Sequence, residues 1–316
     1  MRVLGIGLVA LISFSAQIIA TQCHADTLGQ FGPEGARMRE QLWIVPGADP
    51  AYPLRATLFR PPASMTPASG LPLAVISHGT DDNSRLSVSM PVYYWLSRWF
   101  VERGFAVLLP QRRGHGATGG PLAEAVGNCA EPDHFQSGLE AAKDINAALT
   151  FMRKQPFIDE QQIIAAGVSS GGWASLALAS AYPDSVRAVV NFAGGRGGHA
   201  NGKPLRICGE RNLISASASY AASARVPTRW YYSRNDSYFP PRVAAALANS
   251  WRDSGGHAEL SMLEPYGSDG HRIADDRAGW DLWGVSLDRF LDKVMQSDPV
   301  ENSSLLLEQH ASRHDR

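Results

Sequence analysis

The sequence contains few cysteines and no excess of charge of either sign. Among its 316 residues are three cysteines, and 29 basic residues balance 30 acidic ones to give a net charge of −1. A disulfide-dense miniprotein is excluded, because such domains carry many cysteines in a short chain. The charge balance also excludes the broad basic surface with which proteins bind nucleic acid, so we predict no nucleic-acid partner.

Metal-binding motifs are missing as well. The sequence has no H-E-x-x-H motif and no clustered cysteines and histidines with zinc-ligand spacing, which are the patterns that surround a zinc ion. His199 with a carboxylate is a weaker alternative that no motif supports. We therefore predict no metal site and no cofactor.

Apolar residues and glycine are plentiful. Hydrophobic residues make up 44% of the chain, and there are 30 glycines, which suffices for a sizeable core with many tight connections. The sequence shows no internal repeat and no linker between two domains. We expect one domain over residues 26–296, followed by a polar, frayed tail over residues 297–316.

The first 25 residues have the pattern of a signal peptide. Arg2 is the only charged residue before Asp26, and residues 3–20 are mostly apolar. Cys23 and Ala25 give an approximate small-x-small cleavage site. We predict cleavage after Ala25, export to the periplasm or the extracellular space, and no stable membrane anchor afterwards. An uncleaved anchor is the alternative, because the apolar stretch is only slightly shorter than the roughly 20 residues that span a bilayer.

Two cysteines remain in the mature chain. Disulfides persist in oxidising compartments, so an exported protein with Cys129 and Cys208 is expected to join them. Two separate buried thiols are the alternative, because the sequence does not give the distance between the two side chains.

Short β-rich runs alternate with segments of helical periodicity, such as residues 142–152 and 280–294. This alternation predicts an α/β fold in which a mostly parallel sheet is covered by helices on both faces. The first two strands are joined by a short turn and should form an antiparallel hairpin at the sheet edge. The eight predicted strands are Leu42–Val45, Arg55–Arg60, Leu73–Ser77, Phe105–Pro110, Ile163–Gly167, Ala188–Phe192, Thr228–Ser233 and Glu259–Leu263.

A G-x-S-x-G motif follows the fifth predicted strand. It reads Gly167-Val168-Ser169-Ser170-Gly171 and opens a segment rich in alanine and leucine. This context predicts a sharp turn from strand to helix that raises the Ser169 hydroxyl above the sheet. Ser169 is therefore the predicted nucleophile. Ser170 is a weaker alternative, because it lacks the flanking glycine spacing.

A serine nucleophile requires a base, and the base requires an acid that orients it. Asp236 follows the seventh predicted strand, and His271 lies on the loop after the last one. The carboxyl ends of parallel strands meet at one crevice, so Ser169, Asp236 and His271 can converge there. Asp269 is a rival for the acid, but it would have to reach back within a single loop. We prefer Asp236 because it stands at a strand end.

The combination resembles the α/β-hydrolase superfamily, and its details are similar to the branch of secreted esterases related to dienelactone hydrolases and prolyl oligopeptidases. The resemblance covers roughly residues 42–293. It implies an eight-stranded sheet whose second strand is antiparallel and a catalytic triad of Ser169, Asp236 and His271. We also expect no large cap domain, because only about 35 residues separate the sixth and seventh predicted strands. The motifs that carry it are Ser77-His78-Gly79-Thr80, Gln111-Arg112-Arg113-Gly114-His115-Gly116, the Ser169 elbow, Asn235-Asp236 and Gly270-His271.

The sequence also departs from that branch. Dienelactone hydrolases use a cysteine nucleophile where this chain has Ser169, and the 41 residues before Leu42 leave no room for the propeller of prolyl oligopeptidases. Peptidase activity is disfavoured for that reason. The lipase-type His-Gly-Gly-Gly loop is replaced by His78-Gly79-Thr80-Asp81. We therefore expect the backbone N–H groups of Thr80 and Ser170 to form the oxyanion hole.

Four other histidines are interpreted as structural or exposed. His78 and His115 lie beside glycine turns and should order their loops. His199 and His257 lie in polar segments and are expected to be exposed.

The predicted substrate surface is open. Its expected walls are Thr80, Asp81, the neighbourhood of Trp173, Tyr238 and Phe239, together with the loop over residues 114–129. The two aromatic residues beside Asp236 fit substrate binding and packing against the following helix equally well.

These observations predict an exported serine hydrolase that cleaves carboxylic esters of small molecules through an acyl-enzyme. An amidase or peptidase with the same triad is one alternative, and a non-catalytic binding protein of the same fold is another. The sequence predicts neither the natural substrate nor the oligomeric state.

Overall fold

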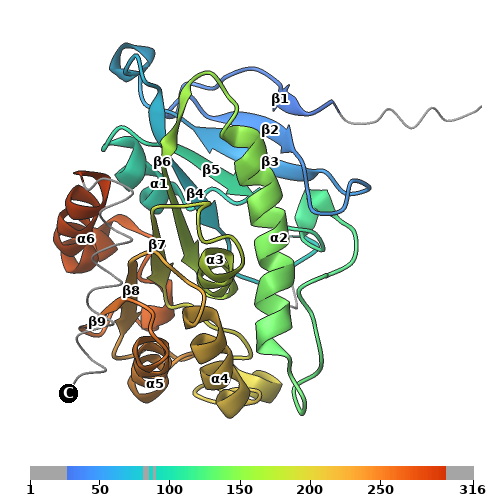
Figure 1. Ribbon diagram of the computed structural model, residues 1–316, viewed down its shortest axis with the longest axis vertical. Helices are drawn as coiled ribbons and strands as arrows, with labels where there is room; N and C mark the ends of the chain where they lie inside the picture. Colours follow the sequence, from blue (N-terminus) through green and yellow to red (C-terminus); the bar gives the residue numbers. More distant parts are fainter. Residues whose placement is uncertain (1–26, 81–84, 88–89, 297–316) are drawn as a thin grey trace, which may run out of the picture.

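The computed structural model describes residues 27–80, 85–87 and 90–296. The predicted signal peptide, the predicted C-terminal tail and Asp81 lie outside the described residues. One sheet organises the rest, in the order β1-β2-β3-β5-β4-β6-β7-β8-β9 (Figure 1). The strands are β1 Gly29–Phe31, β2 Gln41–Val45, β3 Leu54–Phe59, β4 Leu71–Ser77, β5 Ala106–Pro110, β6 Ile158–Val168, β7 Ala188–Phe192, β8 Thr228–Ser233 and β9 Ala258–Leu263.

The strand directions confirm the expected mixed sheet. From β5 to β9 all neighbouring strands are parallel, whereas β3 is antiparallel to both β2 and β5. Strands β2 and β3 form the predicted edge hairpin, and β3 is the second of the eight predicted strands. The ninth strand, β1, adds an outer antiparallel edge beside β2. It was not predicted because its three residues, Gly29–Phe31, are mostly exposed and have no apolar periodicity.

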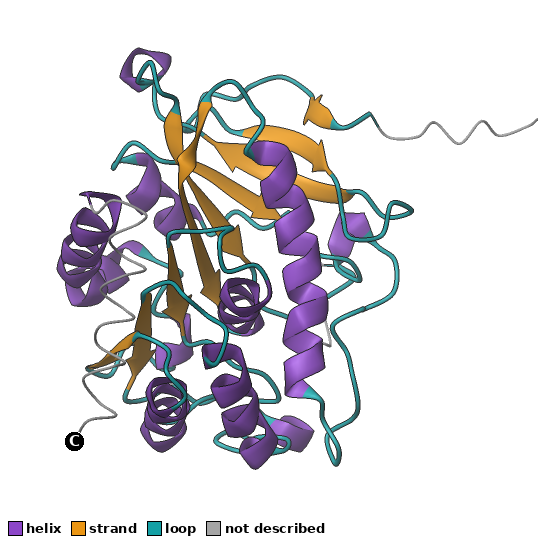
Figure 2. Ribbon diagram, in the orientation of Figure 1, coloured by secondary structure: helices purple, strands orange, loops and turns teal. Residues whose placement is uncertain are grey.

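Helices cover both faces of the sheet (Figure 2). On one face α1 and α6 pack on the apolar side chains of the strands, and on the other face α2, α3, α4 and α5 do so. Successive side chains of a strand point to opposite faces, so Val75 of β4 joins one core and Ile76 joins the other. The helices are α1 Tyr94–Val101, α2 His134–Met152, α3 Ser170–Ala181, α4 Glu210–Ala221, α5 Pro241–Asp253 and α6 Trp280–Gln296.

Local sequence signals set several helix starts. Asp133 caps α2, because its carboxylate accepts a hydrogen bond from the backbone amide of Gln136. Helix α5 begins with Pro241 at its first position, where a missing N–H group costs nothing. Shorter turns of 3-10 helix lie in the loops: η1 Ala63–Met65, η2 Gly116–Thr118, η3 Ala200–Gly202, η4 Gly270–Arg272 and η5 Arg277–Gly279.

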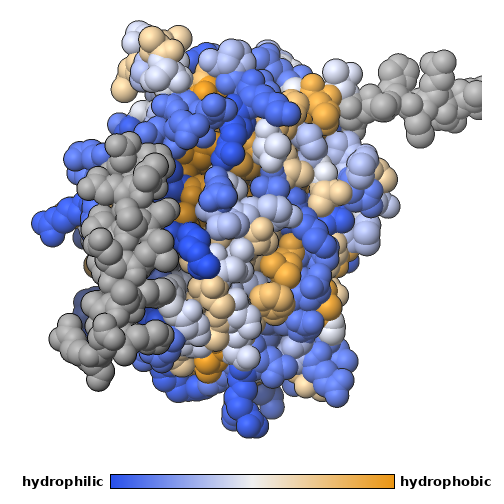
Figure 3. All heavy atoms as spheres, viewed as in Figure 1, coloured by the Kyte–Doolittle hydropathy of each residue, from blue (hydrophilic) through white to orange (hydrophobic). Residues whose placement is uncertain are grey.

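Among the described residues, each connection between consecutive strands from β4 to β9 carries one α-helix. Within the described ranges, no large cap domain is inserted between strands. The face that carries α2 and α4 is mostly hydrophilic, and its apolar residues appear as separate small patches (Figure 3). No helix among the described residues is long and apolar enough to cross a membrane.

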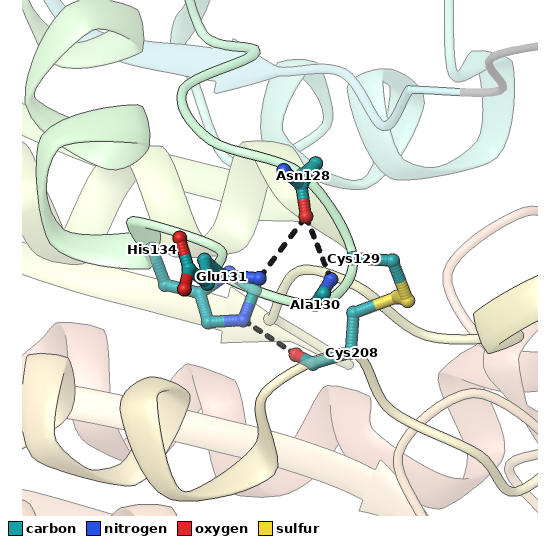
Figure 4. Close-up of a disulfide and its surroundings, with 6 residues drawn as sticks. All are labelled: Asn128, Cys129, Ala130, Glu131, His134 and Cys208. Carbon is teal, nitrogen blue, oxygen red and sulfur yellow. Dashed lines mark hydrogen bonds between the residues drawn. A yellow bond between two sulfur atoms is a disulfide. The ribbon is translucent and has the colours of Figure 1, made fainter.

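A disulfide joins Cys129 to Cys208, with Cα atoms 4.7 Å apart, which confirms the predicted pairing. It ties the loop before α2 to the loop before α4 (Figure 4). Hydrogen bonds hold the backbone on both sides of the disulfide. The side-chain oxygen of Asn128 accepts from the backbone amides of Ala130 and Glu131. His134 Nε2 lies 2.7 Å from the Cys208 carbonyl oxygen. The bond therefore fixes two loops against each other at the carboxyl side of the sheet.

Candidate active site

Ser169 occupies a strained turn between β6 and α3. Its φ of 57° and ψ of −125° lie in a region that non-glycine residues rarely adopt. The turn is possible because Gly167, Gly171 and Gly172 have no side chains: a Cβ atom on any of them would overlap neighbouring atoms, the Ser77 carbonyl in the case of Gly171. The G-x-S-x-G motif thus forms the predicted elbow.

Backbone hydrogen bonds hold this strained residue in place. The Ser169 amide donates to the Phe192 carbonyl at 3.0 Å, and the Ser169 carbonyl accepts from Trp173 and Gly195 at 3.1 and 3.2 Å. The Ser169 side chain is only half-buried. Its position is therefore fixed by the backbone, while the residue stays partly exposed.

The loop after β4 lies directly against Ser169. A Cβ atom on Gly79 would be 3.3 Å from Ser169 Cβ, and the Gly79 amide donates to the Tyr93 hydroxyl at 3.0 Å. Thr80 follows on the same loop. Ser170 is the first residue of α3, and an amide at a helix start has no acceptor within its own helix. The two predicted oxyanion residues thus lie next in the chain to Gly79 and to Ser169.

The imidazole of His271 is paired with Asp236. Its Nδ1 atom lies 3.1 and 3.2 Å from the two carboxylate oxygens, and the Asp236 side chain is fully buried. One of those oxygens also accepts from the amides of Tyr238 and Phe239. Asp236 is thus placed to accept a hydrogen bond from His271 Nδ1, the contact by which an acid orients an imidazole base.

Asp269 does not share this role. Its carboxylate accepts from the backbone amides of His271 and Ser237 and from the Ser237 hydroxyl. Burial alone would raise the pKa of Asp269, but these hydrogen bonds lower it below its usual value. Asp269 therefore orders the loop that carries His271, whereas Asp236 contacts the imidazole itself.

Phe239 links the two halves of the site. The backbone amide of Gly195 is bonded to the Ser169 carbonyl, and Gly195 packs so closely on Phe239 that a Cβ atom would reach the ring at 2.5 Å. The centre of the Phe239 ring is 5.8 Å from that of His271. Ser169 and His271 are thus connected through two intervening residues at the carboxyl rim of the sheet.

Tyr238 is stacked between two histidines. Its ring centre is 4.1 Å from that of His271 and 3.6 Å from that of His199, and His199 Nε2 lies 2.8 Å from the Ser237 hydroxyl. His199 is half-buried, so the prediction that it is exposed is wrong. The error arises because stacking on Tyr238 leaves no trace in the local sequence. His257 is half-buried as well, and burial lowers its pKa.

Trp173 does not line an open surface, contrary to the prediction. Its side chain is fully buried, its indole N–H donates to the His134 carbonyl at 2.9 Å, and its ring packs on Tyr220. Trp173 lies in the first turn of α3, and its side chain packs into the core between α2 and α4. Phe239 is also only 1% exposed, so of the two readings for it, packing is the one observed.

A buried cluster of charged residues lies beneath the Thr80 loop. Arg112 forms an ion pair with Glu124 at 2.6 Å, and Arg196 adds a second at 3.2 Å. Burial would raise the pKa of Glu124, but the two guanidinium groups hold it well below its usual range. The sequence carries no signal for this cluster, because its members come from separate loop segments and share no spacing.

His78 and His115 belong to the same buried region. His78 Nε2 accepts from the Arg112 amide at 3.1 Å, and His115 Nδ1 lies 3.2 Å from two backbone carbonyl oxygens. Burial, reinforced by the charge of Arg112, lowers the pKa of both histidines. Both contact loop backbone, as the structural interpretation expected.

No group of three potential metal ligands occurs among the residues that the structure describes. The described side chains around Ser169 and His271 include hydroxyl groups, charged groups and an imidazole, which are groups that nucleophilic and acid–base chemistry uses.

Comparison with known proteins finds similarity in the central segment that contains the elbow. Residues 91–195, which include the elbow, match the prolyl oligopeptidase family model. A polyketide transferase from a Penicillium species is 31% identical over 98 residues, which are 31% of this chain and 30% of that protein.

Solved structures share the fold at low sequence identity. An acylaminoacyl peptidase from Pyrococcus horikoshii superposes with a TM-score of 0.58 and 16% identity, over 82% of this chain and 42% of the peptidase. An acetyl xylan esterase from Paenibacillus sp. R4 does so with a TM-score of 0.54 and 15% identity, over 85% of this chain and 88% of the esterase. This chain therefore has the α/β-hydrolase fold that these structures share, and its residues 91–195 are similar to the prolyl oligopeptidase family.

Proposed function

We propose that the protein is an exported serine hydrolase that cleaves carboxylic esters of small molecules through a Ser169, His271 and Asp236 triad. The observation that carries the proposal is the buried Asp236 carboxylate bonded to His271 Nδ1, at the rim where the strained Ser169 elbow also lies. A serine on such a turn and an imidazole oriented by a carboxylate are the components of a triad that activates a hydroxyl group.

The proposed reaction has two halves. His271 Nε2 takes the Ser169 proton as Oγ attacks the ester carbonyl carbon, and the carbonyl oxygen becomes an oxyanion held by the amides of Thr80 and Ser170. The C–O bond to the alcohol then breaks, and the alcohol leaves with the proton from His271. Water attacks the acyl-enzyme with His271 as base, and the carboxylic acid is released while Ser169 regains its proton.

An amidase or peptidase reaction through the same triad is the second candidate. The match of residues 91–195 to the prolyl oligopeptidase family favours it, and so does the fold shared with an acylaminoacyl peptidase. The fold shared with an acetyl xylan esterase favours the ester reaction. Rates on an ester and an amide with the same acyl group distinguish the two, and we expect the ester to be cleaved faster.

Export is supported by two features. The Cys129–Cys208 disulfide suits an oxidising compartment, and residues 1–25 have the composition of a signal peptide. N-terminal sequencing of protein recovered from outside the cytoplasm should begin at Asp26.

The direct test is Ser169→Ala, assayed on short p-nitrophenyl esters. We expect kcat to fall on the order of 10⁶-fold, because the step that forms the acyl-enzyme is lost. Ser217→Ala is the control: Ser217 is buried, and its hydroxyl donates to the Leu247 carbonyl between α4 and α5, away from the elbow. An alkyl fluorophosphonate should label Ser169 in the wild type. A wild type that neither hydrolyses esters or amides nor reacts with this probe would be a binding protein, and the proposal would be abandoned.

A further inference from the structure

The side chains of the two oxyanion residues are bonded to each other. The Ser170 hydroxyl donates to Thr80 Oγ1 at 2.9 Å, although the two residues are 90 positions apart in the sequence. This single bond joins the loop after β4 to the first turn of α3, the two segments that supply the proposed oxyanion amides. Neither hydroxyl has a part in the chemistry assigned to the triad.

The bonded pair rests on the buried charged cluster. The Thr80 hydroxyl donates to Glu124 Oε1 at 2.7 Å, and Arg112 Nη2 lies 3.3 Å from Thr80 Oγ1 and 3.5 Å from Ser170 Oγ. His115 Nε2 lies 3.0 Å from Thr80 Oγ1. Arg112 and Glu124 are 1% and 2% exposed, so these bonds form where water competes little and where each bond is correspondingly strong.

The cluster is also electrically unbalanced. Two guanidinium groups, from Arg112 and Arg196, face the single carboxylate of Glu124. Neutral side chains at His78 and His115 follow from their lowered pKa values, so these five residues together carry a net positive charge. That positive charge lies next to the side chains of Thr80 and Ser170. It therefore favours the negative charge that develops on an oxyanion bound by their backbone amides.

We propose that the hydroxyl groups of Thr80 and Ser170 form a clamp that sets the spacing of the two oxyanion amides, with Arg112 and Glu124 as its anchor. Thr80 and Ser170 then have two functions: their amides bind the oxyanion, and their side chains act as positioning groups. The inference rests on the proposed hydrolase function. It adds how the loop after β4 and the first turn of α3 are held at the spacing that the two oxyanion amides require.

Spacing matters because oxyanion donors act only in the transition state. A site must hold its groups within about 0.5 Å of the productive geometry, and a misplacement of about 1 Å can cost about 100-fold in rate. Loss of the clamp should therefore lower kcat and leave KM nearly unchanged, because ground-state binding of the ester does not use these donors fully.

Thr80→Val and Ser170→Ala test the clamp, since each removes a hydroxyl and keeps the backbone amide. We expect kcat for a p-nitrophenyl ester to fall about 10-fold to 100-fold in each, with KM within about twofold of wild type. The affinity for a trifluoromethyl ketone, which forms a tetrahedral adduct with the serine, should fall in parallel with kcat. Thr80→Ser keeps the hydroxyl and should lose much less than Thr80→Val.

The double variant gives the sharpest result. If the two hydroxyls act through their mutual bond, Thr80→Val combined with Ser170→Ala should be no slower than the slower single variant. Multiplying effects would show that the hydroxyls act separately and would overturn the clamp.

Thr228→Val is the matched control for folding. Thr228 is fully buried at the start of β8, and its hydroxyl both donates to the His257 carbonyl and accepts from the Trp230 indole. This variant should lose stability as Thr80→Val does, and keep its kcat. A parallel fall of kcat in Thr228→Val would assign the losses to general destabilisation and refute the clamp.

The two levels of inference fail in different ways. A wild type without hydrolysis or fluorophosphonate labelling removes the proposed function and the clamp together. An active wild type that is inactivated by Ser169→Ala but keeps kcat within twofold in Thr80→Val and in Ser170→Ala retains the function and removes the clamp.

Discussion

The disulfide between Cys129 and Cys208 closes a loop of the unfolded chain that spans 79 positions. Closing a loop of this size removes about 15 cal/mol/K of chain entropy from the unfolded state, which is about 4.5 kcal/mol at 25 °C. Replacing both cysteines by serine should release this constraint. The folded state should change little, because the Cys208 amide donates to the Gly197 carbonyl at 2.8 Å and its carbonyl lies 2.7 Å from His134 Nε2.

The measurement is urea unfolding of the oxidised wild type and of the double variant Cys129→Ser, Cys208→Ser under the same conditions. We expect the free energy of unfolding to fall by up to about 4.5 kcal/mol, and the melting temperature by roughly 9 to 18 °C if the whole term is realised. The m-value should rise, because an unfolded chain without the cross-link exposes more surface. Reduced wild type should match the variant.

Two results would refute this reasoning. A loss of stability below about 1 kcal/mol would mean that chain entropy does not govern the bond. Two reactive thiols in the denatured, unreduced wild type would mean that the bond does not form.

Three further predictions concern the site and its supports. Asp236→Asn should lower kcat about 10⁴-fold, because the imidazole loses the tautomer it needs, whereas Asp269→Asn should mainly lower stability; equal kinetic losses would contradict the assigned roles. The free energy of unfolding should fall as the pH drops below about 6.5, because His78 and His115 bind protons in the unfolded chain but resist them when buried. The loss should be at most about 1.4 kcal/mol per pH unit for each histidine. Unfolding midpoints that stay level between pH 7.5 and 5.5 would argue against this. Gly171→Ala should cost about 1 to 3 kcal/mol or more and abolish activity, because its new methyl group meets the Ser77 carbonyl; thermal unfolding and an ester assay check this.

The sheet could be predicted well because buried parallel strands are continuous apolar runs. Residues 188–192 and 228–233 were predicted with their observed bounds. Strand β6 was predicted from Ile163, yet it begins at Ile158. Its first half contains the polar residues Asp159 and Glu160, and only the second half lies between two neighbours, so the polar start gave no strand signal.

The site could be predicted only in part. Ser169, Asp236 and His271 each follow a predicted strand, and the carboxyl ends of parallel strands meet at one crevice, so the sequence could place all three together. The stacking of His199 and the ion pairs of Glu124 depend on contacts between loops far apart in the chain, for which a single sequence carries no periodic signal. Such contacts become visible only when the loops are placed in space.

The pairing of β4 with β6 has a consequence for folding. Leu73 and Ile163 are partners in the middle of the sheet, so the central layer closes only after much of the chain has emerged from the ribosome. Pairings this distant slow folding, because a long loop must be ordered before its contacts are gained. Asp236 and His271 come later still, so a growing chain already carries its nucleophile while the base and its partner are still unsynthesised.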